Sequence, residues 1–179
     1  MNNRMDQFER AKELFILYHG NTFQMYREGV LEEYKQFDVQ QPLEKQWFEE
    51  LVEKYTKELS IRDWTAADNL AQLASSYKDK AILENVVSFV SRHLMSSDSI
   101  VKLMYAERIV EIVKKMKKEI AIELVHKAYK AAAIILEDIM IKPLIVDPGH
   151  ELANYNLTDK KSLNNRAKKS IEEIKNDLN

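Results

Sequence analysis

Glycine and proline are scarce in this sequence, with three of each in 179 residues. Sheet proteins need such residues at frequent turns, so their scarcity favours long helices joined by short links. Apolar residues also recur along the chain at the spacing of one helix face. The first of these stripes consists of Phe8, Ala11, Leu14, Phe15 and Tyr18. The sequence therefore predicts an all-α fold.

Capping residues and prolines divide the chain into seven to eight predicted helices. Pro42 favours a helix start and Pro143 a helix end, whereas Gly20 either separates the first two helices or lies within one long helix. The helix over residues 118–141 is apolar around most of its circumference, which predicts a buried, central position. The predicted ranges are 6–18, 21–37, 42–59, 60–77, 79–95, 97–116, 118–141 and 159–178.

The chain is expected to form a single domain, residues 1–179, in which residues 1–59 supply the N-terminal helices. Residues 142–158 are predicted to be an irregular loop, because prolines, a glycine and asparagines interrupt the helical pattern there. The last helix, residues 159–178, is poor in large apolar residues, a composition that allows fraying or mobility.

Residues 60–95 and 99–134 share one pattern, offset by 39 positions. Most aligned pairs agree in being apolar or polar, and the predicted caps Ser60 and Ser99 coincide. Periodicity alone does not explain the polar break that both segments contain, at residues 77–80 and 116–119. The pattern predicts two equivalent antiparallel helical hairpins; the alternative is an irregular bundle whose helices happen to have similar lengths.

A helical hairpin repeated at this spacing resembles the HEAT and armadillo proteins, in architecture alone and over residues 60–134. The resemblance implies a short right-handed αα-superhelix, with an irregular helical bundle as the alternative. It also implies that the second helix of each hairpin lines a surface that binds another protein or a peptide. The outward positions of that surface are Glu84, Ser88, Ser91, Glu123, His126, Lys127 and Lys130.

The first functional hypothesis is therefore a non-catalytic interaction or scaffold protein. The second is binding to a nucleic-acid backbone through two basic runs, Lys114–Lys118 and Lys160–Lys169, if both lie on one face. The overall charge disfavours it, because 27 basic residues stand against 29 acidic ones, a net charge of −2. Lysines at the end of a helix also complement its dipole, which is the structural interpretation of the first run.

The third hypothesis is a small enzyme or metal protein that uses Glu123 and His126, or His150. Glu123 and His126 have the Glu-x-x-His spacing of ferritin-like bundles, but a second copy of the motif is absent. His150 follows a Pro-Gly turn that also carries Asp147, and loops often carry sites. We predict neither a cofactor nor a metal. The lack of cysteine, of a secretory signal and of a long apolar stretch predicts a cytoplasmic protein.

Overall fold

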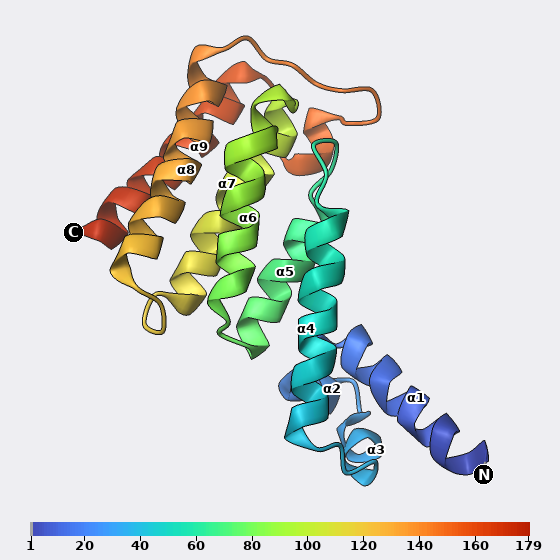
Figure 1. Ribbon diagram of the computed structural model, residues 1–179. Coiled ribbons are helices and arrows are strands. Elements are labelled where there is room, and N and C mark those ends of the chain that lie inside the picture. The colour runs from blue at the N-terminus through green and yellow to red at the C-terminus, as the bar shows by residue number, and fades with distance from the viewer. Residues whose placement is uncertain (1) are drawn as a thin grey trace.

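The computed structural model describes residues 2–179, and this part of the chain is helical, without strands (Figure 1). The predicted all-α fold is confirmed. None of the described helices is long and apolar enough to cross a membrane. The helices are α1 (Asn2–Leu17), α2 (Thr22–Arg27), α3 (Leu31–Gln36), α4 (Gln41–Glu58), α5 (Thr65–Ser76), α6 (Lys80–His93), α7 (Ser99–Met116), α8 (Ile122–Ile141) and α9 (Lys160–Leu178), with 3-10 turns at Leu94–Ser96 and Leu152–Tyr155.

Gly20 ends the first helix, so α1 and α2 are separate. Its φ angle of +67° suits glycine, and a Cβ atom there would lie 2.8 Å from the Tyr77 ring. The next helix then begins at a local cap, because the Asn21 side chain accepts a hydrogen bond of 3.0 Å from the Gln24 amide.

The single helix predicted over residues 21–37 is wrong, because Gly29 separates α2 from α3. Gly29 has a φ angle of +75°, which a continuous right-handed helix does not allow. The change of direction also means that the apolar residues of this range do not all face the core. Phe23 and Tyr26 are 67% and 69% exposed, whereas Tyr34 is buried.

Helices α4 to α9 form two layers (Figure 1). Helices α4, α6 and α8 lie side by side in one layer, and α5, α7 and α9 form the other. Each helix is followed by an antiparallel helix in the opposite layer, while α1–α3 lie beside the first half of α4 (Figure 1). This path brings helices that are close in sequence into contact.

The two predicted hairpins occupy neighbouring positions in these layers but differ in length. Helices α5 and α6 have 12 and 14 residues, whereas α7 and α8 have 18 and 20. The predicted cap at Ser60 is wrong, because α5 begins five residues later, at Thr65. Ser60 instead contacts α7, where its carbonyl accepts a hydrogen bond of 2.8 Å from the Tyr105 hydroxyl. The equivalence of the two hairpins remains a prediction.

The central helix is α7, which corrects the prediction for residues 118–141. Thirteen of the 18 residues of α7 are buried, because it contacts α5, α6, α8 and α9. Helix α8 lies at one edge of its layer and buries only eight of its 20 residues. Ile134 and Ile141 on its outer side are 48% and 80% exposed.

Residues 142–158 form a strap that crosses the ends of the layers and connects α8 to α9 (Figure 1). As predicted, the strap is largely irregular, apart from the short 3-10 turn. Helix α9 then packs along α7 and α8 and buries Leu163, Ala167 and Ile174. Its cap, Asp159, forms a capping box with Ser162.

Candidate functional site

The predicted partner-binding residues lie on the outer side of the α4–α6–α8 layer. Glu84 and Ser91 on α6 are exposed and Ser88 is half-buried, while the four predicted residues of α8 are all exposed. Those four residues are Glu123, His126, Lys127 and Lys130. The structure therefore places them together on one solvent-facing layer.

A hollow lies beside this surface, between α4 and α6; we call it the α4–α6 groove. It consists of two adjoining cavities of about 880 and 300 Å³, both of which include Phe48 and Asp79. The surface inside is mainly apolar. Its apolar lining residues are Pro42, Phe48, Val52, Tyr77 and Ala81.

The floor of the α4–α6 groove is held by aromatic packing. The Phe48 and Tyr77 rings stack with centroids 4.4 Å apart. Burial, together with the nearby carboxylate of Glu44, raises the pKa of Tyr77 to about 12, so its phenol stays protonated at neutral pH. The sequence did not reveal this groove, because Phe48 and Tyr77 follow the same spacing as core residues.

The rim of the α4–α6 groove is charged, and several of its charges pair along their own helices. Lys45 lies 3.9 Å from Glu49, and Lys57 lies 2.5 Å from Glu53 on the α4 side. On the α6 side, Lys80 lies 3.4 Å from Glu84. The groove therefore presents a mainly apolar floor between balanced rims.

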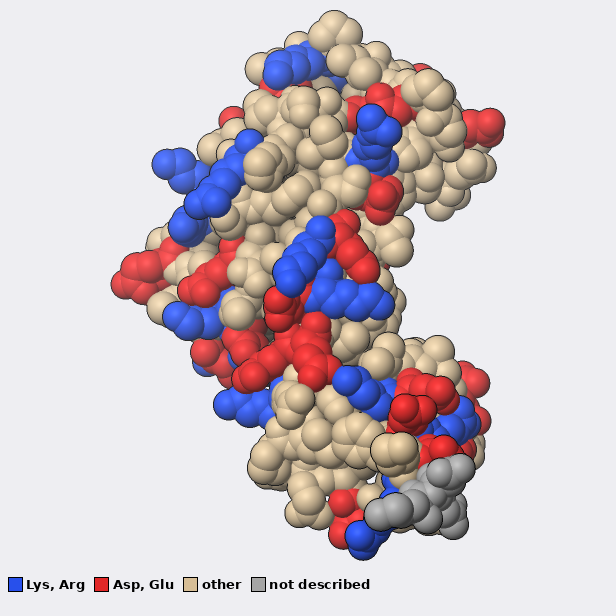
Figure 2. Space-filling view, turned by 45° about the vertical axis from the view of Figure 1, so that its right-hand side comes forward, with Lys and Arg blue, Asp and Glu red and all other residues tan. Residues whose placement is uncertain are grey.

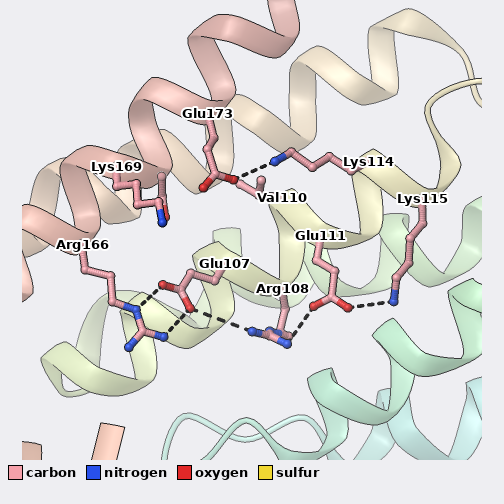
Figure 3. Close-up of a pocket in the computed structure, with 10 residues that line it drawn as sticks. Glu107, Arg108, Val110, Glu111, Lys114, Lys115, Arg166, Lys169 and Glu173 are labelled. Carbon is pink, nitrogen blue, oxygen red and sulfur yellow. Dashed lines mark hydrogen bonds and ion pairs between the residues drawn. The ribbon is translucent and has the colours of Figure 1, made fainter. Parts of the chain in front are cut away.

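A second hollow, the α7–α9 groove, has a volume of about 660 Å³ and a charged lining (Figure 3). It brings the two predicted basic runs together, since Lys114 and Lys115 of the first run face Arg166 and Lys169 of the second. Three glutamates lie between them, Glu107, Glu111 and Glu173.

Most cations of the α7–α9 groove are paired with these carboxylates. Arg166 holds Glu107 with two hydrogen bonds of 2.6 and 2.8 Å, and this contact raises the pKa of its guanidinium. Lys114 and Lys115 lie 2.7 Å from Glu173 and Glu111, respectively. Lys169 forms no ion pair with the described residues.

This pairing leaves little free positive charge for phosphate groups. The same interleaving appears on the face drawn in Figure 2, where basic and acidic side chains alternate across the middle of the molecule. Binding to a nucleic-acid backbone requires cations that can replace counterions. The two basic runs share a groove, where Lys114 and Arg166 join α7 to α9 through Glu173 and Glu107, and binding to a nucleic-acid backbone stays a prediction.

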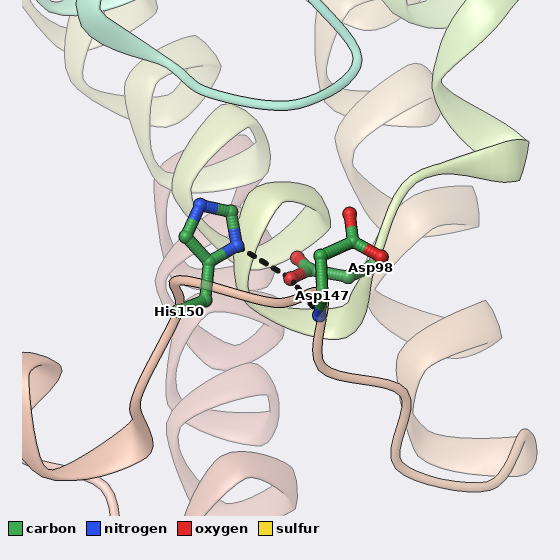
Figure 4. A group of neighbouring side chains, drawn as sticks. All are labelled: Asp98, Asp147 and His150. Atoms are coloured by element: carbon green, nitrogen blue, oxygen red, sulfur yellow. Dashed lines mark hydrogen bonds and ion pairs between the residues drawn. The ribbon is translucent and has the colours of Figure 1, made fainter.

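His150 lies in the strap and contacts the start of α7, where Asp98 caps the helix (Figure 4). The buried Asp98 carboxylate accepts hydrogen bonds from the Val101 amide at 2.7 Å and the Asp147 amide at 2.9 Å. The His150 Nδ1 atom lies 2.6 Å from the same carboxylate. Trp64 packs beside the imidazole, with ring centroids 5.6 Å apart. Asp98 thus anchors the strap.

Asp98, Asp147 and His150 also form a group whose ligand atoms all lie within 4.8 Å of one another. The residues fit a metal poorly, because both Asp98 oxygens already accept hydrogen bonds from nitrogen donors and one lies 2.6 Å from the imidazole. Such a short separation suits a hydrogen bond, whereas two ligands of one ion lie further apart. Glu123 and His126 lie on the exposed side of α8, outside any such group within residues 2–179.

Comparison with protein-family models, with curated proteins and with solved structures finds no match to this chain. Functional proposals therefore depend on the residues and contacts described above.

Proposed function

We propose that this protein is a non-catalytic interaction domain and that its α4–α6 groove binds a peptide segment of a protein partner through apolar side chains. The mainly apolar floor of this groove carries the proposal. Exposed apolar surface between polar rims is typical of sites that bind other proteins.

The dimensions of the groove suit a short helix. Its lining follows α4 from Pro42 to Lys57, which spans roughly 22 Å at the rise of an α-helix. A bound helix of about four turns would present apolar residues at every third or fourth position to this floor. Phe48 and Val52 are one turn apart on α4 and are 3% and 7% exposed, so the edges of their side chains would contact successive residues of such a stripe.

The distribution of charge also supports binding rather than chemistry. Carboxylates and lysines on the rim neutralise one another within α4 and within α6. Acid–base catalysis needs titratable groups that converge on one reacting atom. The Tyr77 phenol, whose pKa is raised to about 12, is a poor proton donor or acceptor near neutral pH.

A groove-filling substitution tests this proposal. Ala81 lines the groove and is half-buried, and its amide rather than its side chain contacts the Asp79 cap, so Ala81→Trp fills the hollow without removing the cap. Peptides of about 16 residues would be selected from a display library on the wild-type protein. We expect enriched peptides with apolar residues at helical spacing, and Ala81→Trp should raise their Kd at least tenfold in fluorescence anisotropy.

Ser91→Trp is the matched control, because Ser91 is exposed on α6 and does not line the groove. Its Kd values should equal those of the wild-type protein. If the selected peptides bound Ala81→Trp with the same Kd as the wild-type protein, the proposal would be refuted. Selection of acidic peptides alone would also refute it, as would duplex DNA binding that weakens steeply with salt, since both would point to the α7–α9 groove.

A further inference from the structure

The outer side of α8 carries a stripe of residues spaced alternately by four and three positions, which we call the α8 seam. This is the spacing of the a and d positions of a coiled coil. All six residues of the α8 seam are exposed. They are Glu123, Lys127, Lys130, Ile134, Glu137 and Ile141.

No described element covers the α8 seam. Helix α8 contacts α6, α7 and α9 through its other sides, and it lies at the edge of its layer (Figure 1). Ile134 and Ile141, which both occupy a positions, are therefore 48% and 80% exposed. This side of α8 therefore lacks a partner within the described chain.

The residues of the seam complement one another when a second α8 lies antiparallel, centred on residue 132. Every a position then faces a d position of the other copy. Lys127 faces Glu137 of the second copy, and Glu137 faces its Lys127. Ile134 and Ile141 face Lys130 and Glu123 of the second copy, and the aliphatic stem of Lys130 can cover Ile134.

Other arrangements of two α8 helices give less favourable contacts between seam residues. A parallel pair places identical residues opposite each other, so that Lys127, Lys130 and both glutamates meet like charges. A shift of one heptad in one direction opposes Lys127 with Lys130. A shift of one heptad in the opposite direction leaves only four of the six seam residues of each copy facing a seam residue of the other copy. Ala131 and Ala133 flank the centre and are small enough for close approach of the two helices.

We propose that the protein forms a two-fold symmetric homodimer through the antiparallel α8 seam. The inference is independent of the α4–α6 groove, which involves other surfaces of the molecule. A single helix pair buries less area than a standard protein interface, so we expect a dissociation constant in the micromolar range.

Sedimentation equilibrium of the full chain between about 1 and 300 μM tests the dimer. The mass should rise with concentration from 21.0 kDa toward twice that value. Ile134→Lys places a lysine opposite Lys130 of the second copy and should weaken dimerisation at least tenfold. Ile122→Lys is the matched control, because Ile122 is 58% exposed on α8 but lies outside the seam. It should dimerise like the wild-type protein.

A charge exchange tests the register. Lys127→Glu and Glu137→Lys should each weaken the dimer, because each creates two like-charge contacts, whereas the double variant should restore it. A mixture of the two single variants should form a heterodimer. A wild-type protein that stays monomeric at 300 μM overturns the proposal, as does equal weakening by Ile122→Lys. Failure of the double variant to recover overturns the antiparallel register.

Discussion

At the scale of single residues, the pair Lys102 and Asp138 joins helices α7 and α8. Their side chains are 8% and 7% exposed, and the ammonium lies 2.8 Å from the carboxylate. Burial raises the pKa of Asp138, but hydrogen bonds from Lys102 and Lys142, with their charges, outweigh it, so the pKa lies below the usual value. The Asp138 carboxylate therefore depends on the two lysines to remain charged inside the protein.

Removal of only one partner should be costly. Asp138→Ala leaves the Lys102 ammonium buried without its carboxylate, and we expect a loss of about 3–5 kcal/mol in the free energy of unfolding. The double variant Lys102→Met/Asp138→Leu should recover most of that loss, because two apolar side chains need no partner. Urea denaturation measures both; equal destabilisation of the single and double variants would contradict the account.

The effect of Asp138→Ala should also depend on pH. Because the folded-state pKa of Asp138 is lowered, its contribution to stability is complete above the unfolded pKa of about 3.9. The contribution is lost as pH falls through the lower, folded-state pKa. The difference in unfolding free energy between wild type and Asp138→Ala should therefore be largest near pH 7 and shrink toward pH 2.

At the scale of secondary-structure elements, helix caps formed between near neighbours can be predicted from the sequence, whereas the contacts of the strap with distant residues cannot. Asn21 and Asp79 cap helices through amides two or three residues away, so the sequence alone reveals them. The partners Asp98 and His150 are 52 residues apart, and only the fold brings them together. Ser60 resembles a cap in sequence, but its hydroxyl accepts the Arg62 amide before α5 begins, and its backbone amide and carbonyl bond to the Tyr105 hydroxyl on α7.

Loss of the anchor should therefore loosen the strap and the start of α7 together. Asp98→Ala removes a cap and the acceptor for the strap, and we expect a loss of about 2–3 kcal/mol in the free energy of unfolding. Amide hydrogen exchange at Ile145 and Asp147 should accelerate, since both amides are bonded to residues at the start of α7.

Asp98→Asn provides the control for the strap. Its carbonyl oxygen can still accept the Val101 amide, but the second carboxylate oxygen is lost. This variant should keep the cap and lose most of the anchoring. Unchanged exchange in the strap of both variants would show that other contacts hold it.

At the scale of the whole molecule, the scarcity of glycine and proline was enough to predict an all-α fold, but not its centre. Residues 118–141 have the more continuous apolar sequence, yet α7 is central and α8 lies at an edge. A helix that is apolar around its circumference can lie in the core of a protein or in an interface with another protein. A single sequence does not distinguish the two. The α4–α6 groove escaped prediction for a similar reason, because its floor follows ordinary core spacing.

The local stability of each helix should follow how many other helices surround it. Amides of α7, which four other helices surround, should exchange most slowly and report global unfolding. Amides of α2 and α3 should exchange faster, because each of these helices has only six residues and buries a single side chain. Native-state hydrogen exchange followed by mass spectrometry measures both; equal protection of α2 and α7 would contradict this order.

The alternation of successive helices between the two layers has a kinetic consequence. Each of the helices α4–α9 finds its main neighbours among the one or two helices before and after it, so few long loops have to close before apolar surface is buried. Such a chain can acquire its native contacts progressively from the amino-terminal end as it leaves the ribosome. The order of the helices along the chain therefore favours rapid folding.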